Sequence, residues 1–176
     1  MEIIRSIHAA TAKGGQNFIL IGGHALNFQG ISRSTGDIDL MVERSDSPFW
    51  RSLLISLGYN IFHETPAFIQ SKPPLLAAWP IDLMLVSAET IQKASSEATT
   101  TEIFGPPIKV ASIGSLIAMK LHALKYVDPV RALKDQSDLM ELLKLAGISP
   151  ASEQFRQLCI KYATLVIHER LSEFKQ

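Results

Sequence analysis

The most informative segment of this chain is IGGHALNFQGISRSTGDIDLMV, residues 21–42. It begins with a glycine pair that ends an apolar run. Thirteen residues separate this pair from Asp37-Ile38-Asp39, which leads into a second apolar run. Side chains alternate along a β-strand, so the two aspartates face one side and Ile38 faces the core. Two like charges about 7 Å apart on one strand face repel each other unless a cation lies between them. Carboxylates in this arrangement suit Mg²⁺, whereas the alternative is a solvated edge strand that happens to carry aspartate twice.

A third carboxylate favours the magnesium interpretation. Asp82 lies at the start of IDLMLV, residues 81–86, which is a second strongly apolar strand candidate. If the two strands are neighbours, three carboxylates meet at one edge of the sheet. A pair of magnesium ions about 3.5–4 Å apart needs such a ligand set for an in-line phosphoryl displacement. The sequence therefore predicts a two-metal site formed by Asp37, Asp39 and Asp82.

The residues before the aspartates are suited to bind phosphate. Gly22 and Gly23 lie between an apolar strand and a helical turn, where backbone N–H groups can approach a triphosphate closely. Arg33 and Thr35 lie in the linker between the glycines and the carboxylates, and Arg33 can neutralise phosphate charge. We expect these four residues to contact a nucleotide.

The composite pattern resembles the nucleotidyltransferase signature of the DNA polymerase β superfamily. That signature consists of an apolar strand, Gly-Gly or Gly-Ser, a short spacer, Asp-x-Asp and a third carboxylate on a neighbouring strand. The resemblance covers residues 18–86. The run RSTGD, residues 33–37, further resembles small bacterial and archaeal members. These include the minimal nucleotidyltransferases and the toxin-type nucleotidyltransferases of abortive-infection systems.

The resemblance implies a transferase that moves a nucleoside monophosphate from a nucleoside triphosphate to a hydroxyl. Gly22 and Gly23 would hold the phosphates, Asp37 and Asp39 would hold two Mg²⁺ ions, and Mn²⁺ is an alternative metal. Asp82 would bind the catalytic metal and help to deprotonate the attacking hydroxyl. The acceptor stays open between an RNA such as a tRNA end, a protein and a small molecule. The alternative function is a toxin–antitoxin component, or a nucleotide-binding partner protein with little turnover of its own.

The chain changes character near residue 110. Residues 1–110 predict an α/β (α+β) core, with a mixed β-sheet flanked by helices that carries the catalytic site. Residues 111–176 predict a helical segment packed on this core, with helices at 112–126, 130–146 and 152–173. The last helix carries an apolar stripe that predicts either core packing or a surface for a partner protein or a homodimer.

One charged residue lies in an apolar stripe of the helical segment. Lys120 is flanked by apolar side chains on the helical wheel, which is unusual for lysine. Its stem can pack while the ammonium group reaches the surface, or the ammonium can bind the triphosphate. Asp135 lies beside two leucines on the next helix and needs a partner, for which Lys120 and Arg131 are the candidates.

The bulk composition limits the function classes. Lys and Arg together number 17, as do Asp and Glu, so bulk charge does not favour non-specific nucleic-acid binding. The single cysteine, Cys159, cannot form an intramolecular disulfide. No apolar run reaches the roughly 18 residues that a membrane span needs, and the first residues lack a signal-peptide pattern. We therefore expect a cytoplasmic protein that does not enter a membrane.

Overall fold

The computed structural model divides into two compact units, Met1–Ser112 and Ile113–Gln176. The residues that the structure describes are 2–75, 78–126 and 129–173, and for 129–131 they include the backbone alone. The expected packing of the helical segment on the core stays a prediction.

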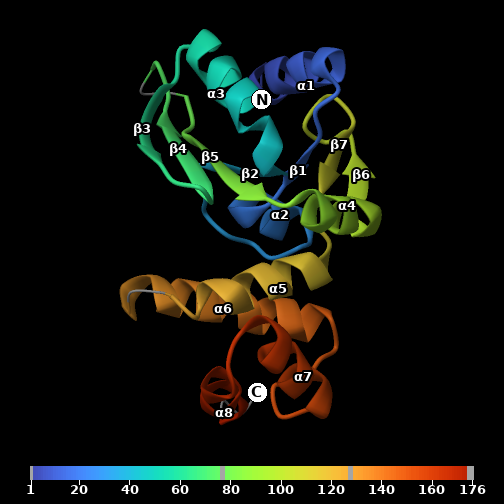
Figure 1. Cartoon of the computed structure of the whole chain (residues 1–176). Coiled ribbons are helices and arrows are strands. Elements are labelled where there is room, and N and C mark those ends of the chain that lie inside the picture. The colour runs from blue at the N-terminus through green and yellow to red at the C-terminus, as the bar shows by residue number, and fades with distance from the viewer. Residues whose placement is uncertain (1, 76–77, 127–128, 174–176) are drawn as a thin grey trace. The chain divides into compact units, whose positions relative to one another are not determined.

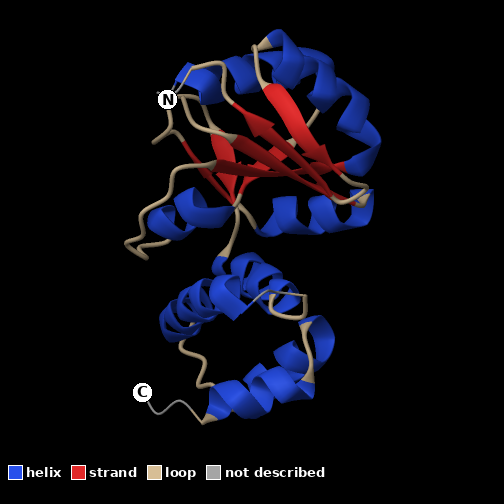
Figure 2. Ribbon diagram, turned by 90° about the vertical axis from the view of Figure 1, so that its left-hand side faces the viewer, coloured by secondary structure: helices blue, strands red, loops and turns tan. Residues whose placement is uncertain are grey.

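The first unit is built around one mixed sheet with the strand order β3-β4-β5-β2-β1-β7-β6. The strands are β1 (Phe18–Leu20), β2 (Ile38–Glu43), β3 (Asn60–Glu64), β4 (Phe68–Lys72), β5 (Ile81–Val86), β6 (Thr99–Thr101) and β7 (Ile108–Val110). The helical elements are α1 (Glu2–Gly14), α2 (Gly22–Phe28), the 3₁₀ turn η1 (Arg44–Asp46), α3 (Ser47–Ser56) and α4 (Ala88–Glu97). Helices cover both faces of the sheet, with α1 and α3 on one face and α2 and α4 on the other (Figures 1 and 2). The predicted mixed sheet with flanking helices is confirmed.

The centre of the sheet is apolar because its strands are covered on both faces. In β2, Ile38, Leu40 and Val42 are at most 1% exposed. The parallel neighbour β5 repeats the pattern with Ile81 and Leu83, which are fully buried. Parallel strands covered by helices on both faces are expected to be this apolar. The carboxylates Asp39 and Asp82 are therefore exceptions within a buried sheet, which makes their position informative.

In the residues that the structure describes, the second unit consists of helices joined by turns and contains no strand. Its helices are α5 (Ile113–Ala123), α6 (Pro129–Leu145), α7 (Glu153–Tyr162) and α8 (Leu165–Ser172). The prediction of one continuous helix over 152–173 is wrong. Ala163 leaves the helical region with φ −133° and ψ −128°, and the Thr164 side chain accepts a hydrogen bond from the Ile167 N–H. Threonine at this position caps a new helix, so the chain begins α8 there.

The break also changes which residues of the last segment are buried. A continuous helix would place Leu165 and Val166 in the apolar stripe of Phe155. In the structure these two residues are 43% and 71% exposed, whereas Ile167 and Leu171 are buried. Within the described residues, no helix combines the length and the apolar character that crossing a membrane requires.

Candidate active site

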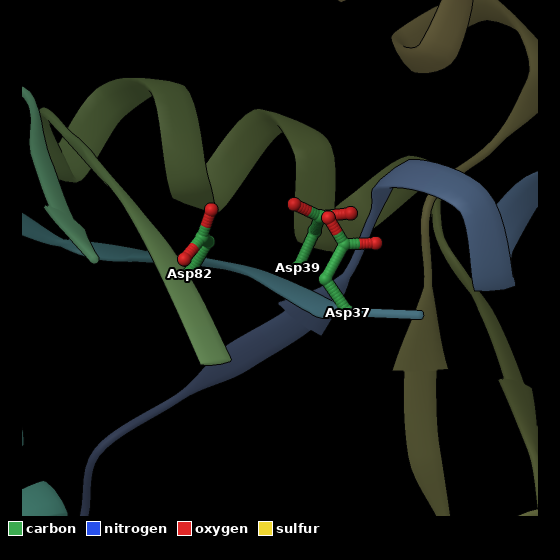
Figure 3. A group of neighbouring side chains, drawn as sticks. All are labelled: Asp37, Asp39 and Asp82. Atoms are coloured by element: carbon green, nitrogen blue, oxygen red, sulfur yellow. The ribbon is translucent and has the colours of Figure 1, made fainter. Parts of the chain in front are cut away.

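Three carboxylates converge on one face of the sheet. Strands β2 and β5 run parallel with Asp39 opposite Asp82, so both side chains point to the same side. Asp37 immediately precedes β2 and, two residues before Asp39, shares its face. One carboxylate oxygen from each aspartate lies within 4.8 Å of the others. Figure 3 shows the three side chains on the same side of the two strands. The structure thus brings together the three residues predicted to bind metal, and their catalytic role stays a prediction.

The convergence is electrostatically unfavourable without a cation. Burial, together with the charges of Asp37 and Asp82, raises the pKa of Asp39 from 3.8 to about 6. A hydrogen bond from the Gly23 N–H and the charge of Arg33 oppose this rise without cancelling it. Three partly buried carboxylates with excess negative charge are the oxygen donors that Mg²⁺ or Mn²⁺ prefers. The residues present therefore fit a divalent metal ion.

The glycine pair makes room for the carboxylate site. The Ile21 N–H donates to the Asp39 carbonyl at 2.9 Å, which fixes the start of α2 beside β2. Gly22 has φ +62°, and a Cβ at this position would collide with the Asp39 carboxylate. A Cβ at Gly23 would lie 2.5 Å from the Thr35 hydroxyl oxygen. The glycines are thus required by the close approach of these side chains, and their contact with phosphate stays a prediction.

The linker before Asp37 is held by specific hydrogen bonds. The Thr35 hydroxyl donates to Asp37 Oδ1 at 2.8 Å and orients that carboxylate. Asn27 on α2 bonds the backbone of Arg33 twice, accepting from its N–H at 2.8 Å and donating to its carbonyl at 2.9 Å. The Arg33 charge lowers the pKa of Asp39. Arg33 therefore acts on the carboxylate site, and the nucleotide contacts of Arg33 and Thr35 stay predictions.

Sequence reasoning missed the residue that orients the third carboxylate. Gln70 on β4 lies opposite Asp82 in the antiparallel pair of β4 and β5. Its side-chain amide donates to Asp82 Oδ2 at 2.8 Å. No sequence pattern marks Gln70, because its importance depends on the register between two strands. Residues that fix the orientation of a metal ligand commonly tune metal affinity.

A second missed feature is an aromatic stack at the start of α2. The His24 imidazole stacks on the indole of Trp79, with ring centroids 4.6 Å apart and planes at 19°. Phe104 meets the imidazole edge-on at 6.4 Å. Burial lowers the pKa of His24, and the charge of Asp37 opposes this only in part. His24 is therefore neutral at pH 7, and it lies close enough to Asp37 to feel its charge.

Lys120 is placed in the helical unit and forms ion pairs there. Its ammonium nitrogen lies 2.6 Å from Asp135 Oδ1 and 2.6 Å from Asp138 Oδ2. The three side chains are 13%, 9% and 8% exposed. Of the two candidate partners for Asp135, Lys120 is the one that the structure shows, and the side chain of Arg131 lies outside the described residues. The predicted contact of Lys120 with the triphosphate stays a prediction.

A comparison with protein families identifies the chain as a nucleotidyltransferase. A family profile described as "Nucleotidyl transferase AbiEii toxin, Type IV TA system" matches residues 7–176. No curated protein matches the sequence.

Solved structures of nucleotidyltransferases share the fold. The antibiotic-resistance factor ANT(2'')-Ia has a TM-score of 0.59 at 17% identity, covering 97% of this chain and 88% of that chain. The lincosamide antibiotic adenylyltransferase LnuA has a TM-score of 0.57 at 15% identity, covering 82% of this chain and 97% of that chain. The Megavirus polyadenylate synthase has a TM-score of 0.50 at 20% identity, covering 82% of this chain and 31% of that chain. At these identities the likeness concerns the fold alone.

The family match spans nearly the whole chain, and its description names a nucleotidyl transferase. The chain therefore belongs to the AbiEii nucleotidyltransferase toxin family.

Proposed function

We propose that the protein transfers a nucleoside monophosphate from a nucleoside triphosphate to a hydroxyl acceptor in a magnesium-dependent reaction. The observation that carries this proposal is the convergence of Asp37, Asp39 and Asp82 within 4.8 Å. A cluster of carboxylates this close, in which the pKa of Asp39 is raised to about 6, is stabilised by divalent cations.

In the proposed site, Asp37 and Asp39 hold two Mg²⁺ ions, and Asp82 completes the ligand set for one of them. When bound, the ions neutralise phosphate charge and activate the attacking oxygen. Mn²⁺ suits the same oxygen donors. Thr35 fixes the Asp37 carboxylate and Gln70 fixes the Asp82 carboxylate, so two of the three ligands are oriented before any substrate binds.

The proposed reaction is an in-line displacement at the α-phosphorus. The acceptor oxygen forms a bond to this phosphorus, the bond to the bridging β-phosphate oxygen breaks, and pyrophosphate leaves. The Asp82 carboxylate helps to remove the proton of the attacking hydroxyl. Catalysis of this kind depends mainly on positioning and charge stabilisation, which a rigid sheet edge supplies.

The triphosphate is proposed to lie against the start of α2. Gly22 and Gly23 are proposed to contact the phosphates through their backbone, and Arg33 adds positive charge next to Asp39. Thr35 is proposed to contact the nucleotide from the same linker. A lysine ammonium group can donate three hydrogen bonds. The Lys120 ammonium donates one to Asp135 and one to Asp138. We propose that the Lys120 ammonium also contacts the triphosphate.

The family name suggests a biological role. We propose that the protein is the toxin of a toxin–antitoxin pair, so that a partner protein limits its turnover. The hydroxyl acceptor is an RNA such as a tRNA end, a protein or a small molecule. The C-terminal helices are the expected surface for a partner or a second copy, and the exposed Leu165 and Val166 on α8 are consistent with such a contact.

The test is a search for the labelled acceptor. The purified protein is incubated with each α-³²P-labelled nucleoside triphosphate, magnesium and an extract of the source organism. Nuclease and protease digestion then separate RNA, protein and small-molecule products. We expect label in one product class, and none when a chelator removes the metal. The proposal would be contradicted if none of the four nucleotides gave a labelled product, both in the absence and in the presence of the proposed antitoxin partner.

A further inference from the structure

An aromatic side chain with an exposed ring lies next to the carboxylate site. Trp79 is 38% exposed, although one face of its indole is covered by the stacked His24 imidazole. The exposed part of the ring therefore belongs to its other face and its edges. Tryptophan combines a large apolar ring with a strong preference for flat partners, so an uncovered face needs an explanation.

The backbone around Trp79 fixes its place relative to the aspartates. The Tyr59 hydroxyl donates to the Trp79 carbonyl at 2.9 Å. The Ile38 N–H, between the two aspartates of the Asp-x-Asp motif, donates to the carbonyl of Pro80 at 2.9 Å. Asp82 follows three residues after Trp79 in the chain. The indole is thus held at the end of β5 where the carboxylates converge.

His24 holds the covered face of Trp79 in place. The imidazole is 9% exposed and lies between the face of Trp79 and the edge of Phe104. Its Nε2 atom is buried and has no hydrogen-bond partner among the residues that the structure describes. The charge of Asp37 acts on this same imidazole, which places it beside the carboxylates.

We propose that the exposed face of Trp79, supported by His24, stacks a nucleobase next to the three carboxylates. This inference rests on the proposed function, because it assumes that a nucleotide reaches the carboxylates. The base belongs either to the nucleoside triphosphate or to a nucleic-acid acceptor. Both sources offer the same flat ring with polar edges, and stacking on an aromatic side chain tolerates any base.

The test compares ligands that differ in whether they carry a base. The full-length protein with Mg²⁺ is titrated with ATP, GTP, CTP, UTP, inorganic tripolyphosphate and a short single-stranded RNA. The variants are Trp79→Ala, which removes the ring, and Trp79→Phe, which keeps a ring. Leu75→Ala is the matched control because Leu75 is 70% exposed in the same loop. Melting curves establish that each variant is folded.

If the base is that of the triphosphate, Trp79→Ala weakens nucleotide binding on the order of five- to one-hundred-fold. Tripolyphosphate binding is unchanged, Trp79→Phe recovers most of the affinity, and Leu75→Ala has no effect. If the base is that of the acceptor, only the binding of RNA shows this loss. Wild-type fluorescence of Trp79 is quenched by the ligand whose base stacks.

Two outcomes would overturn the inference. In the first, Trp79→Ala binds every nucleotide and the RNA as tightly as the wild type. In the second, it loses affinity for tripolyphosphate as much as for nucleotides, which would make the effect independent of a base. Failure of the proposed function looks different, because wild-type protein would then bind neither tripolyphosphate nor any nucleoside triphosphate. The RNA titration alone would then decide whether Trp79 stacks a base.

Discussion

Replacing Asp39 with asparagine should stabilise the metal-free protein at neutral pH. Asparagine keeps the shape of the side chain and its oxygen can still accept the Gly23 N–H, but the negative charge is lost. The fold raises the pKa of Asp39 from 3.8 to about 6. At a pH above both values, this rise corresponds to on the order of 3 kcal/mol of stability that the wild type lacks.

The sign of the pH dependence follows from proton binding. Between about pH 4 and pH 6 the folded protein retains the Asp39 proton and the unfolded chain releases it. The unfolded state therefore binds fewer protons, and the free energy of unfolding falls as the pH rises through this window. The asparagine of the variant has no proton to release. The variant should equal the wild type near pH 4 and exceed it at pH 8.

Melting curves in a chelator at pH 4 and pH 8 make the comparison. A gain of 3 kcal/mol in a chain of this size raises the melting temperature by about 6–12 °C. Adding Mg²⁺ should raise the melting temperature of the wild type more than that of Asp39→Asn, because the variant has lost a ligand. Glu102→Gln, which removes an exposed carboxylate in the turn between β6 and β7, is the control and should shift neither curve. The reasoning is refuted if Asp39→Asn gains nothing at pH 8, or gains as much at pH 4.

Three further substitutions test other parts of the molecule. Lys120→Met removes the ammonium that pairs with the buried Asp135 and Asp138, and should cost about 3–5 kcal/mol of stability in a melting curve. Asp135→Asn added to it should restore part of this loss, and a ten- to hundred-fold weaker affinity for nucleotide in Lys120→Met would support the triphosphate contact. Gln70→Leu removes the hydrogen bond to Asp82 Oδ2 and should weaken Mg²⁺ affinity about 10- to 100-fold in a metal titration, with an unchanged affinity counting against the positioning role of Gln70. Gly22→Ala forces a Cβ against Asp39 at a positive φ, so the protein should be clearly destabilised, and a normal melting temperature would contradict the packing described.

The central strands can be predicted from the sequence because apolar pattern and alternation determine them locally. The run IDLMLV predicts a strand over residues 81–86, and β5 has these bounds. The shared face of Asp37 and Asp39 follows from the same alternation. The sequence alone does not determine whether the strand of Asp82 pairs with the strand of Asp39. Pairing between strands is a long-range property, and the structure shows it as a register of β2 with β5.

With one exception, each feature that could not be predicted from the sequence depends on contacts between residues far apart in the chain. Gln70 acquires its role from the register of β4 with β5, and Trp79 stacks on His24 across 54 intervening residues. The exception is the end of α7, which was missed for a local reason. The segment after Ser152 has continuous apolar periodicity, which outweighed the weaker signal of Thr164 as a helix cap.

The measurement that tests the central claim most directly is the transfer rate of Asp39→Asn. Once the acceptor is known, the wild type and the variant are compared with the same α-labelled nucleotide, acceptor and Mg²⁺ concentration. We expect the metal-free variant to melt at or above the temperature of the metal-free wild type, and the variant with Mg²⁺ to transfer label at least about a hundred-fold more slowly than the wild type. A folded Asp39→Asn protein that transfers label at the wild-type rate would contradict it.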